Sequence, residues 1–149
     1  KKMVFHVFIA HPIMKWKNIP KDINSWLGFV YIITEKKTGK FYIGQKKFWF
    51  KKTLPPLKGK KRRRRKLVES DWRTYHSSSR LLQQMIEDKG EKSFKFEILH
   101  WCRNKAEMNY LELYEQIQRQ ALLDDKCLNG IIQVRISKKG LKRLRDVLK

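Results

Sequence analysis

The sequence has few acidic residues for its length. Its 149 residues include 14 Asp and Glu against 36 Lys and Arg, which gives a formal net charge of +22 at pH 7. A folded domain with this charge repels itself, and binding to a polyanion relieves the repulsion. Nucleic acid is therefore the first partner that we expect, and an anionic membrane surface is the second.

Cysteine is scarce, since the chain has only Cys102 and Cys127. Two cysteines without a second pair of ligands do not build a four-ligand zinc site. We therefore expect buried, reduced thiols in a cytosolic protein. Long apolar runs are also lacking, because none approaches the roughly 18 residues of a membrane-spanning helix. Residues 1–12 lack the small-residue cleavage site of a secretion signal and are interpreted as a strand.

The apolar content of 41% and the length suit one domain with a single hydrophobic core. Residues 1–27 are interpreted as an N-terminal extension that contains the possible strand. Residues 28–136 are expected to form the main domain. Residues 137–149 predict a basic amphipathic helix with Leu141, Leu144 and Leu148 on one face.

Alternating apolar positions predict the strands of the main domain. Two short apolar runs, 28–34 and 40–44, flank a turn at Thr38-Gly39 and predict a hairpin. Residues 93–101 alternate apolar and polar side chains, and residues 131–136 form a final β-prone run.

Two helices are predicted between these strands. The first covers residues 77–89, which include a serine cap at the start, and Gly90 follows its end. The second covers residues 104–123, where Asn104 and Glu107 have the spacing of a capping box. The pattern as a whole predicts an α+β fold, in which helices flank a small antiparallel sheet.

A strongly basic segment covers residues 51–70. Pro55 and Pro56 interrupt any regular element, and residues 58–66 hold eight positive charges in nine positions, so we expect a mobile loop. A solvated loop without a partner and a targeting signal are the alternatives to nucleic-acid contact. Contact is favoured because the rest of the chain is basic too. The residues assigned to DNA binding are Lys58, Lys60, Lys61, Arg62, Arg63, Arg64, Arg65 and Lys66, with Arg80 on the following helix.

The hairpin carries one tyrosine on each arm, Tyr31 and Tyr42, and in this order of elements it resembles the GIY-YIG nuclease superfamily. The second half of that motif is literal at residues 42–44, whereas the first half reads GFVY, with one extra residue before Tyr31. A Trp-x-x-Tyr segment before a serine-rich helix start is similar to phage-type members. The resemblance covers residues 28–136.

The resemblance implies a metal-dependent DNA endonuclease that hydrolyses phosphodiester bonds with Mg²⁺ or Mn²⁺ and no small-molecule cofactor. The expected partner is double-stranded DNA rather than a membrane. A phage or mobile-element homing enzyme, acting in the cytoplasm of a bacterial host cell, is the implied setting. The alternative from another class is a non-catalytic nucleic-acid-binding protein of ribosomal or packaging type.

Hydrolysis of a phosphodiester needs a base, a cation at the developing oxyanion and a positive side chain on the phosphate. The resemblance assigns the base to Tyr31 and a positioning role to Tyr42. Because a free phenol has a pKa near 10, Lys46 is a candidate for easing its ionisation. The alternative is that both tyrosines merely stabilise the hairpin.

The resemblance also implies a carboxylate metal ligand on the second helix, with Glu112 first and Glu115 as the alternative. Helical spacing places both with Arg119 on one polar stripe. An ordinary solvent face with a Glu115–Arg119 ion pair remains possible. The side chains expected on the opposite, apolar face are Tyr110, Tyr114, Ile117 and Ala121.

The phosphate-binding arginine is expected on or before the first helix, where Arg73 is preferred over Arg80. Tyr75 or His76 would support it, and Asn129 would orient the site or only form an Asn-Gly turn. The remaining histidines are interpreted as structural: His6, His11 and His100.

Overall fold

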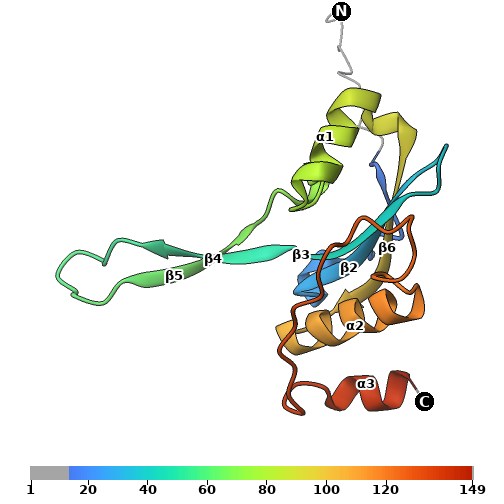
Figure 1. Cartoon of the computed structure of the whole chain (residues 1–149). Helices are drawn as coiled ribbons and strands as arrows, with labels where there is room; N and C mark the ends of the chain where they lie inside the picture. Colours follow the sequence, from blue (N-terminus) through green and yellow to red (C-terminus); the bar gives the residue numbers. More distant parts are fainter. Residues whose placement is uncertain (1–13, 149) are drawn as a thin grey trace, which may run out of the picture.

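The computed structural model describes residues 14–148, and a four-stranded sheet forms its centre (Figure 1). The strand order is β1 (Trp16–Lys17), β6 (Phe94–Cys102), β2 (Gly28–Glu35) and β3 (Phe41–Lys47). The three long strands pair antiparallel as predicted, whereas the short β1 pairs parallel with β6. The predicted hairpin and the α+β fold are confirmed. The strand expected in residues 1–12 lies outside the described residues.

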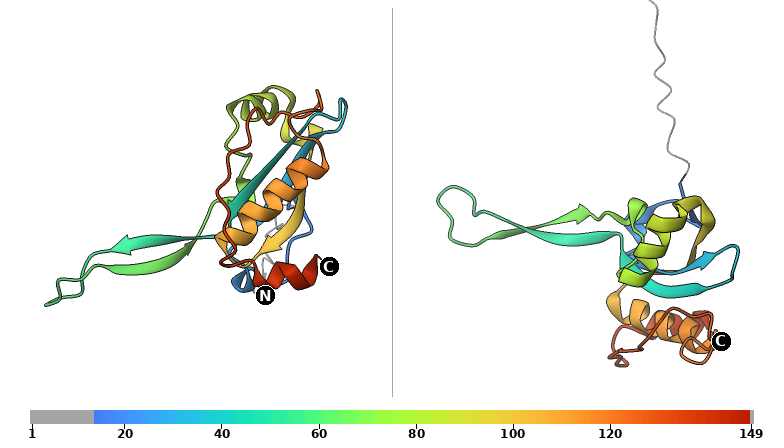
Figure 2. Two further views of the ribbon diagram at one scale, coloured as in Figure 1. Left: turned by 60° about the horizontal axis from the view of Figure 1, so that its bottom comes forward. Right: turned by 45° about the horizontal axis from the view of Figure 1, so that its top comes forward.

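Alternation along the central strand β2 divides the core into two layers. Phe29, Tyr31 and Ile33 face the layer of α1 (Arg80–Lys89), whereas Val30 and Ile32 face the layer of α2 (Lys105–Gln118). Figure 2 shows the two helices on opposite sides of the sheet. Successive side chains of the hairpin therefore point to opposite faces of the sheet, and only side chains on the same face can contact one another.

The helix α1 begins and ends at the predicted signals. The Ser79 hydroxyl accepts the Leu82 N–H at 3.3 Å, and Gly90 ends the helix with a φ of 84°. Two 3₁₀ turns, η2 (Trp72–Thr74) and η3 (Glu91–Ser93), flank this region, and a third, η1 (Ile23–Ser25), precedes β2.

The helix α2 starts after Asn104, whose side chain accepts the Glu107 N–H at 2.9 Å. Glu107 does not complete the predicted capping box. Its buried carboxylate accepts the Arg103 N–H and pairs with Arg143 at 2.6 Å, which ties α3 (Lys142–Val147) to α2. A glutamate at the third helical position thus joins two helices instead of closing one cap.

Two predicted helices are shorter than expected. The helix α2 ends at Gln118 rather than residue 123, because Gln120 adopts a φ of 53° and the Ala121 N–H bonds back to the Gln116 carbonyl. The helix α3 begins at Lys142 rather than residue 137, after Gly140 with a φ of 87°. A left-handed residue ends or delays each helix.

The strand predicted over residues 131–136 does not form. Residues just before it occupy the edge of β3: the Phe41 N–H bonds to the Lys126 carbonyl, and the Phe41 carbonyl accepts the Leu128 N–H. The β-prone run that follows has no strand partner and is mostly exposed. A strand needs a neighbour with free backbone groups, and residues 126–129 already bond to Phe41 and Ile43 at the start of β3.

The prediction of a loop over residues 51–70 is wrong. Two strands, β4 (Trp49–Leu54) and β5 (Arg64–Glu69), pair antiparallel in this segment. Pro55 and Pro56 follow the end of β4 and therefore do not interrupt the ladder. We call β4, β5 and the connecting residues 55–63 the basic ribbon, which projects from the sheet in Figure 1.

Both cysteines are free thiols, as predicted, but Cys127 is only partly buried rather than buried. Cys102 is fully buried, and burial raises the pKa of its thiol to about 12. Among residues 14–148, no helix is both long enough and apolar enough to cross a membrane.

Candidate active site at the edge of strand β3

Tyr31 reaches the edge of the sheet by passing over Gly44. The two residues are direct partners in the β2–β3 ladder, and a Cβ atom at Gly44 would overlap the Tyr31 ring and hydroxyl. Any other residue at position 44 would therefore displace the phenol. Because Gly44 has no side chain, the Tyr31 side chain can lie across the edge strand at this position.

Three phenols gather on the α1 face at this point. The Tyr31 ring centroid lies 6.3 Å from that of Tyr42 and 6.1 Å from that of Tyr75. The Tyr42 hydroxyl lies 3.5 Å from Ser78 Oγ at the exposed rim. Lys46 Nζ lies 4.0 Å from the Tyr75 ring centroid and 2.6 Å from Asp71 Oδ1.

The structure selects Tyr75 rather than His76 as the third polar ring. His76 Nε2 instead contacts a Glu91 carboxylate oxygen at 2.6 Å, and its ring lies beside Phe96. Successive residues in this extended segment point to different sides, so the sequence could not choose between the two neighbours.

Burial strongly perturbs Tyr31, which is 1% exposed. Desolvation raises the pKa of its phenol well above 10, and the neighbouring Tyr75, Tyr42 and Glu112 side chains raise it further. Burial also raises the pKa of Tyr75. In this conformation Tyr31 remains protonated at neutral pH, which argues against its predicted role as the base.

The raised pKa predicts a specific alkaline loss of stability. The neutral Tyr31 phenol makes its full contribution to the free energy of unfolding below pH 10, which is the pKa in the unfolded chain. This contribution is lost as the pH rises towards the pKa in the folded protein, because the unfolded chain releases the proton first. Over that range the wild type should lose up to about 1.4 kcal/mol more per pH unit than Tyr31→Phe. Urea unfolding at pH 8 and pH 11 measures the difference. The exposed Tyr110→Phe control should follow the wild type, and parallel losses in wild type and Tyr31→Phe would contradict the assignment.

Glu112 lies on α2 and faces the sheet. Its carboxylate accepts a hydrogen bond from Gln45 Nε2 and another from Gln116 Nε2 at 3.3 Å. Burial raises its pKa, and Gln45, Lys105 and Gln116 partly offset the increase. Among the residues that the structure describes, no cation forms an ion pair with Glu112 within 4.0 Å.

The polar stripe of α2 is oriented opposite to the expectation. Glu112 and Glu115 are partly buried towards the sheet, whereas Tyr110, Tyr114 and Ile117 are exposed, the last at 63%. The usual hydrophobic arrangement would turn these carboxylates to solvent. Of the predicted apolar face, only Ala121 is buried.

Glu115 is occupied by other partners. His100 Nε2 lies 2.7 Å from one of its carboxylate oxygens, and Arg119 Nε lies 3.1 Å from the other. The Glu115–Arg119 pair, which the alternative interpretation expected, is therefore present, and His100 contacts the same carboxylate. Glu112 is left as the carboxylate available to a metal ion.

Gln45 connects the hairpin to α2 and was missed by the sequence analysis. Its side-chain nitrogen donates to Asn109 Oδ1 at 3.0 Å as well as to Glu112, and its oxygen accepts from Lys105 Nζ at 2.6 Å. Gln45 lies two positions after Ile43, which packs in the α2 layer. The period of two along a strand was the available signal.

Asn129 acts as a backbone partner of β3. Its Oδ1 accepts the Ile43 N–H at 2.9 Å, and its Nδ2 donates to the Ile43 carbonyl at 2.8 Å. One buried side chain therefore satisfies both backbone groups of the residue before Gly44. Asn129 therefore fixes the backbone of β3 next to Gly44, and its hydrogen bonds to β3 are with that backbone rather than with the phenols.

The two candidate arginines differ in their surroundings. Arg73 pairs with Glu69 at 3.0 Å and stacks on Trp72, so its contacts lead away from the phenols. Arg80 is the first, exposed residue of α1, and its side chain has no hydrogen bond or ion pair within residues 14–148. Arg80 follows closely after Ser78, the neighbour of Tyr42.

Among residues 14–148, the side chains around Glu112 offer a divalent cation a single carboxylate. Within the described part of the chain, no group of three His, Cys, Asp or Glu side chains could hold a metal ion. A single carboxylate without a cationic partner fits a hard ion that keeps waters and substrate phosphate as its other ligands, as Mg²⁺ does. The residues present therefore fit such an ion at Glu112 and do not form a closed metal cage.

Comparison with known families agrees with this geometry. Residues 13–132 match the family model described as "Putative endonuclease segE, GIY-YIG domain". No curated protein and no solved structure matches the chain. The matched segment contains every strand of the central sheet and the helix that carries Glu112. The chain therefore belongs to the GIY-YIG endonuclease family, in its SegE-type branch, and is a nuclease whose substrate is nucleic acid.

Proposed function

We propose that this nuclease is a metal-dependent DNA endonuclease that hydrolyses one phosphodiester bond per active site. One observation carries the proposal. At the open edge of β3, the carboxylate of Glu112 has no cationic partner within residues 14–148 and lies near enough to the Tyr31 phenol to raise its pKa. A protein that only binds nucleic acid has no need of a half-buried carboxylate within electrostatic range of a buried phenol.

Glu112 would hold Mg²⁺ or Mn²⁺, with Gln45 and Gln116 fixing the orientation of its carboxylate. When bound, such an ion stabilises negative charge on the phosphate and lowers the pKa of a coordinated water. A glutamate whose pKa is raised by burial gains most from a nearby cation, because the cation compensates the unfavourable buried charge.

We assign the base to Tyr42 and the positioning role to Tyr31, which reverses the prediction from sequence. Tyr42 is only partly buried, and its hydroxyl reaches the exposed rim beside Ser78. In its deprotonated form, Tyr42 Oη would take one proton of the attacking water as the water oxygen bonds to phosphorus and the bond to the 3′ oxygen breaks. The 3′ oxygen would leave as a hydroxyl by taking a proton from solvent. Tyr31, kept neutral by burial, would hold the Tyr42 ring in place by packing beside it.

Phosphate binding is assigned to Arg80 in preference to Arg73. Arg80 lies at the start of α1 near the exposed hydroxyls, whereas Arg73 is engaged by Glu69. Lys46 is close to the phenols, but Asp71 compensates its charge in the free protein. Lys46 therefore supports Tyr75 and supplies positive charge to the site only if Asp71 moves.

Plasmid nicking tests the proposal directly. Supercoiled DNA should be converted to the open circle with Mg²⁺ or Mn²⁺, and EDTA should abolish the conversion. The resemblance to the family implies 5′-phosphate and 3′-hydroxyl ends, which ligase would reseal. Cleavage that persists in EDTA would overturn the metal requirement, and DNA binding without nicking under any divalent ion would overturn the enzyme assignment.

The setting that we propose is a phage or mobile-element homing enzyme. It would act in the cytoplasm of a bacterial cell, on double-stranded DNA. The SegE-type family match and the similarity to phage-type members support this setting.

The basic ribbon should dominate the salt dependence of DNA binding. Replacing Arg62–Arg65 together with alanine should reduce the slope of log affinity against log salt by up to about 3.6, because each phosphate contact releases about 0.9 counterion. Fluorescence anisotropy between 50 and 300 mM salt measures the slope. A matched variant removes four exposed charges near α3: Lys138, Lys139, Lys142 and Arg145. Equal slopes for the two variants would show that the ribbon has no special part in binding.

A further inference from the structure

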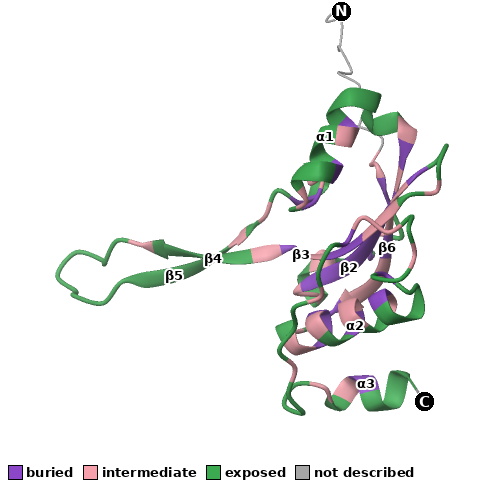
Figure 3. Cartoon of the chain, viewed as in Figure 1, coloured by how far each residue is buried: buried purple, intermediate pink, exposed green. Residues whose placement is uncertain are grey.

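The basic ribbon has no hydrophobic core of its own. Nine of the twelve residues of β4 and β5 are exposed and none is buried (Figure 3), and the exposed residues include Phe50 at 48% and Leu67 at 58%. Apolar side chains that stay exposed on a projecting arm contribute little to a hydrophobic core. They are suited to contact with another molecule, and thymine methyl groups are an apolar feature of a DNA groove.

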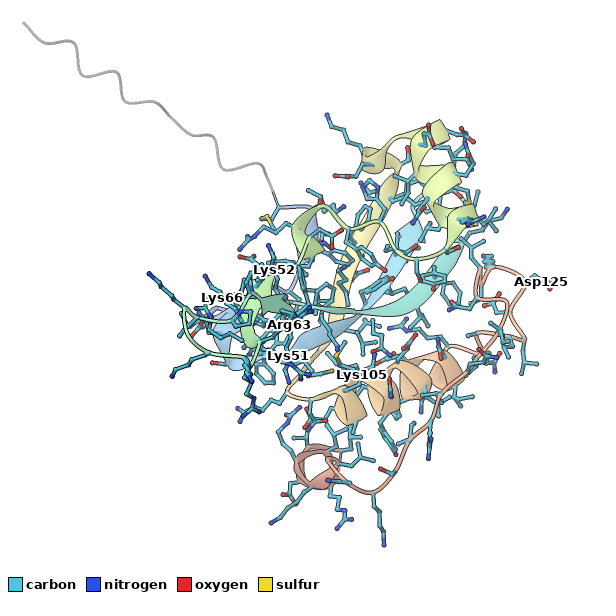
Figure 4. All side chains as sticks on the ribbon, turned by 90° about the vertical axis from the view of Figure 1, so that its left-hand side faces the viewer. Lys51, Lys52, Arg63, Lys66, Lys105 and Asp125 are labelled. Atoms are coloured by element: carbon cyan, nitrogen blue, oxygen red, sulfur yellow. The ribbon has the colours of Figure 1, made fainter. Side chains whose placement is uncertain are left out.

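The charges of the ribbon repel one another in the free protein. Lys52 lies directly opposite Lys66 in the ladder, a like-charge pair that destabilises an isolated hairpin. No acidic side chain pairs with a Lys or Arg of residues 51–66 in the described chain. Viewed along the ribbon in Figure 4, Lys51, Lys52, Arg63 and Lys66 spread to different sides of its axis. Such an arrangement suits a partner that surrounds the ribbon with negative charge.

The base of the ribbon is fixed to the active-site strand. Phe48, between β3 and β4, is fully buried, and its carbonyl accepts the Ser70 N–H at 2.8 Å. Ser70 Oγ donates to the Lys47 carbonyl at 2.6 Å, and Trp72 Nε1 donates to Glu69 at 2.9 Å. These contacts anchor the base of the ribbon to the hairpin that carries the phenols.

We infer that the basic ribbon enters the major groove of B-form DNA and thereby selects duplex DNA as the substrate. This inference rests on the proposed DNA endonuclease function. Two strands about 4.8 Å apart, with their side chains, fit a groove about 12 Å wide but not the minor groove of about 6 Å. Six residues per strand extend about 20 Å, or about six base pairs. The ribbon reads DNA to one side of the scissile phosphate.

A-form RNA provides a strict comparison. It has the same phosphate charge, but its major groove is too deep and narrow for side chains to read. We expect wild-type binding to a 30-base-pair DNA duplex to be at least about tenfold tighter than to the RNA duplex of the same sequence. Binding is measured in EDTA by anisotropy, so the result does not depend on cleavage.

A shortened ribbon should remove this preference. Phe50 and Val68 are direct partners, so an Asn-Gly turn between them can replace residues 51–67 and leave Phe48 and Ser70 in place. This variant should bind DNA and RNA duplexes with equal, weaker affinity. Retention of the full preference for DNA would overturn the inference.

A second variant guards against misfolding of the first. Lys52→Glu creates an opposite-charge pair with Lys66, which should stabilise the hairpin while weakening DNA binding by at least about tenfold. Lys142→Glu, on α3, makes the same change in net charge and should weaken binding less. Equal losses of DNA affinity in the two variants would show that the ribbon contributes only through the net charge of the protein. That result would overturn the inference that the ribbon enters the groove.

Dimethyl sulfate footprinting identifies the groove, since the reagent methylates guanine N7 in the major groove and adenine N3 in the minor groove. With Glu112→Gln protein, guanines within about six base pairs of the preferred nick should be protected. Protection of adenine alone would overturn the assignment. If the protein does not cut DNA, guanine protection by the wild type that is absent with the shortened ribbon would still support groove entry. Failure of the endonuclease proposal would be seen separately, in the nicking assay.

Discussion

Glu112→Gln is expected to abolish DNA cleavage while the protein keeps its fold. The substitution preserves shape and an acceptor oxygen for Gln45 but removes the charge that would hold a divalent ion. Loss of the ion's stabilisation of the transition state, several kcal/mol, corresponds to at least about 10³-fold in rate. Raised Mg²⁺ should not restore cutting. Single-turnover nicking under excess protein measures the effect.

Glu112→Gln should not lower the stability of the protein or its affinity for DNA, although it abolishes cleavage. The Glu112 pKa is raised by burial, so the neutral form is favoured in the folded state and the ionised form opposes folding at neutral pH. Glu112→Gln should therefore unfold at the same or a higher urea concentration than wild type at pH 7. Its DNA affinity should be equal or greater, since one negative charge near the phosphate is gone.

Glu115→Gln is the matched control, one helical turn along α2. This change breaks contacts with His100 and Arg119 and should lower stability without abolishing cleavage. Should Glu115→Gln abolish cutting while Glu112→Gln does not, the metal ligand is Glu115. Should neither change affect cutting, the carboxylates of α2 have no catalytic role.

Tyr42→Phe is expected to reduce cleavage by 10²- to 10⁴-fold, the usual contribution of a general base. Only the hydroxyl is removed, and the ring remains packed against Tyr31. DNA affinity should be unchanged. The measurement is the single-turnover rate at saturating protein, which separates the chemical step from binding.

Tyr31→Phe distinguishes the two phenols. On the proposed assignment, Tyr31 stays protonated and acts by position, so removal of its hydroxyl should lower the rate only about tenfold, equivalent to one hydrogen bond. If instead Tyr31→Phe loses 10²-fold or more and Tyr42→Phe cuts normally, Tyr31 is the base and must become ionised when DNA and metal bind. Normal cutting by both variants would leave the two tyrosines with a structural role alone.

Local patterns predicted the elements whose signals lie within a few residues. The hairpin follows from two apolar runs around Thr38-Gly39, and the start of α2 follows from Asn104. The errors arise where a distant segment decides the outcome. Residues 131–136 are β-prone but have no partner, because residues 126–129 already occupy β3. Residues 51–54 and 64–69 appear disordered by charge, yet they pair with each other.

The sequence by itself indicated nucleic acid as the partner, an α+β fold, and Tyr31 and Tyr42 as candidate site residues. Charge, periodicity and a short motif suffice for this, because all three can be recognised without knowing how distant segments pack. Only the tertiary structure decided which side chains meet. It turned the carboxylates of α2 inward and its tyrosines outward, placed Tyr31 over Gly44 at the sheet edge, and brought Gln45 to Glu112. Burial is a property of the packed molecule, and burial raises the pKa values of Tyr31 and Glu112. The roles of these groups therefore follow from packing between segments that are far apart in the chain.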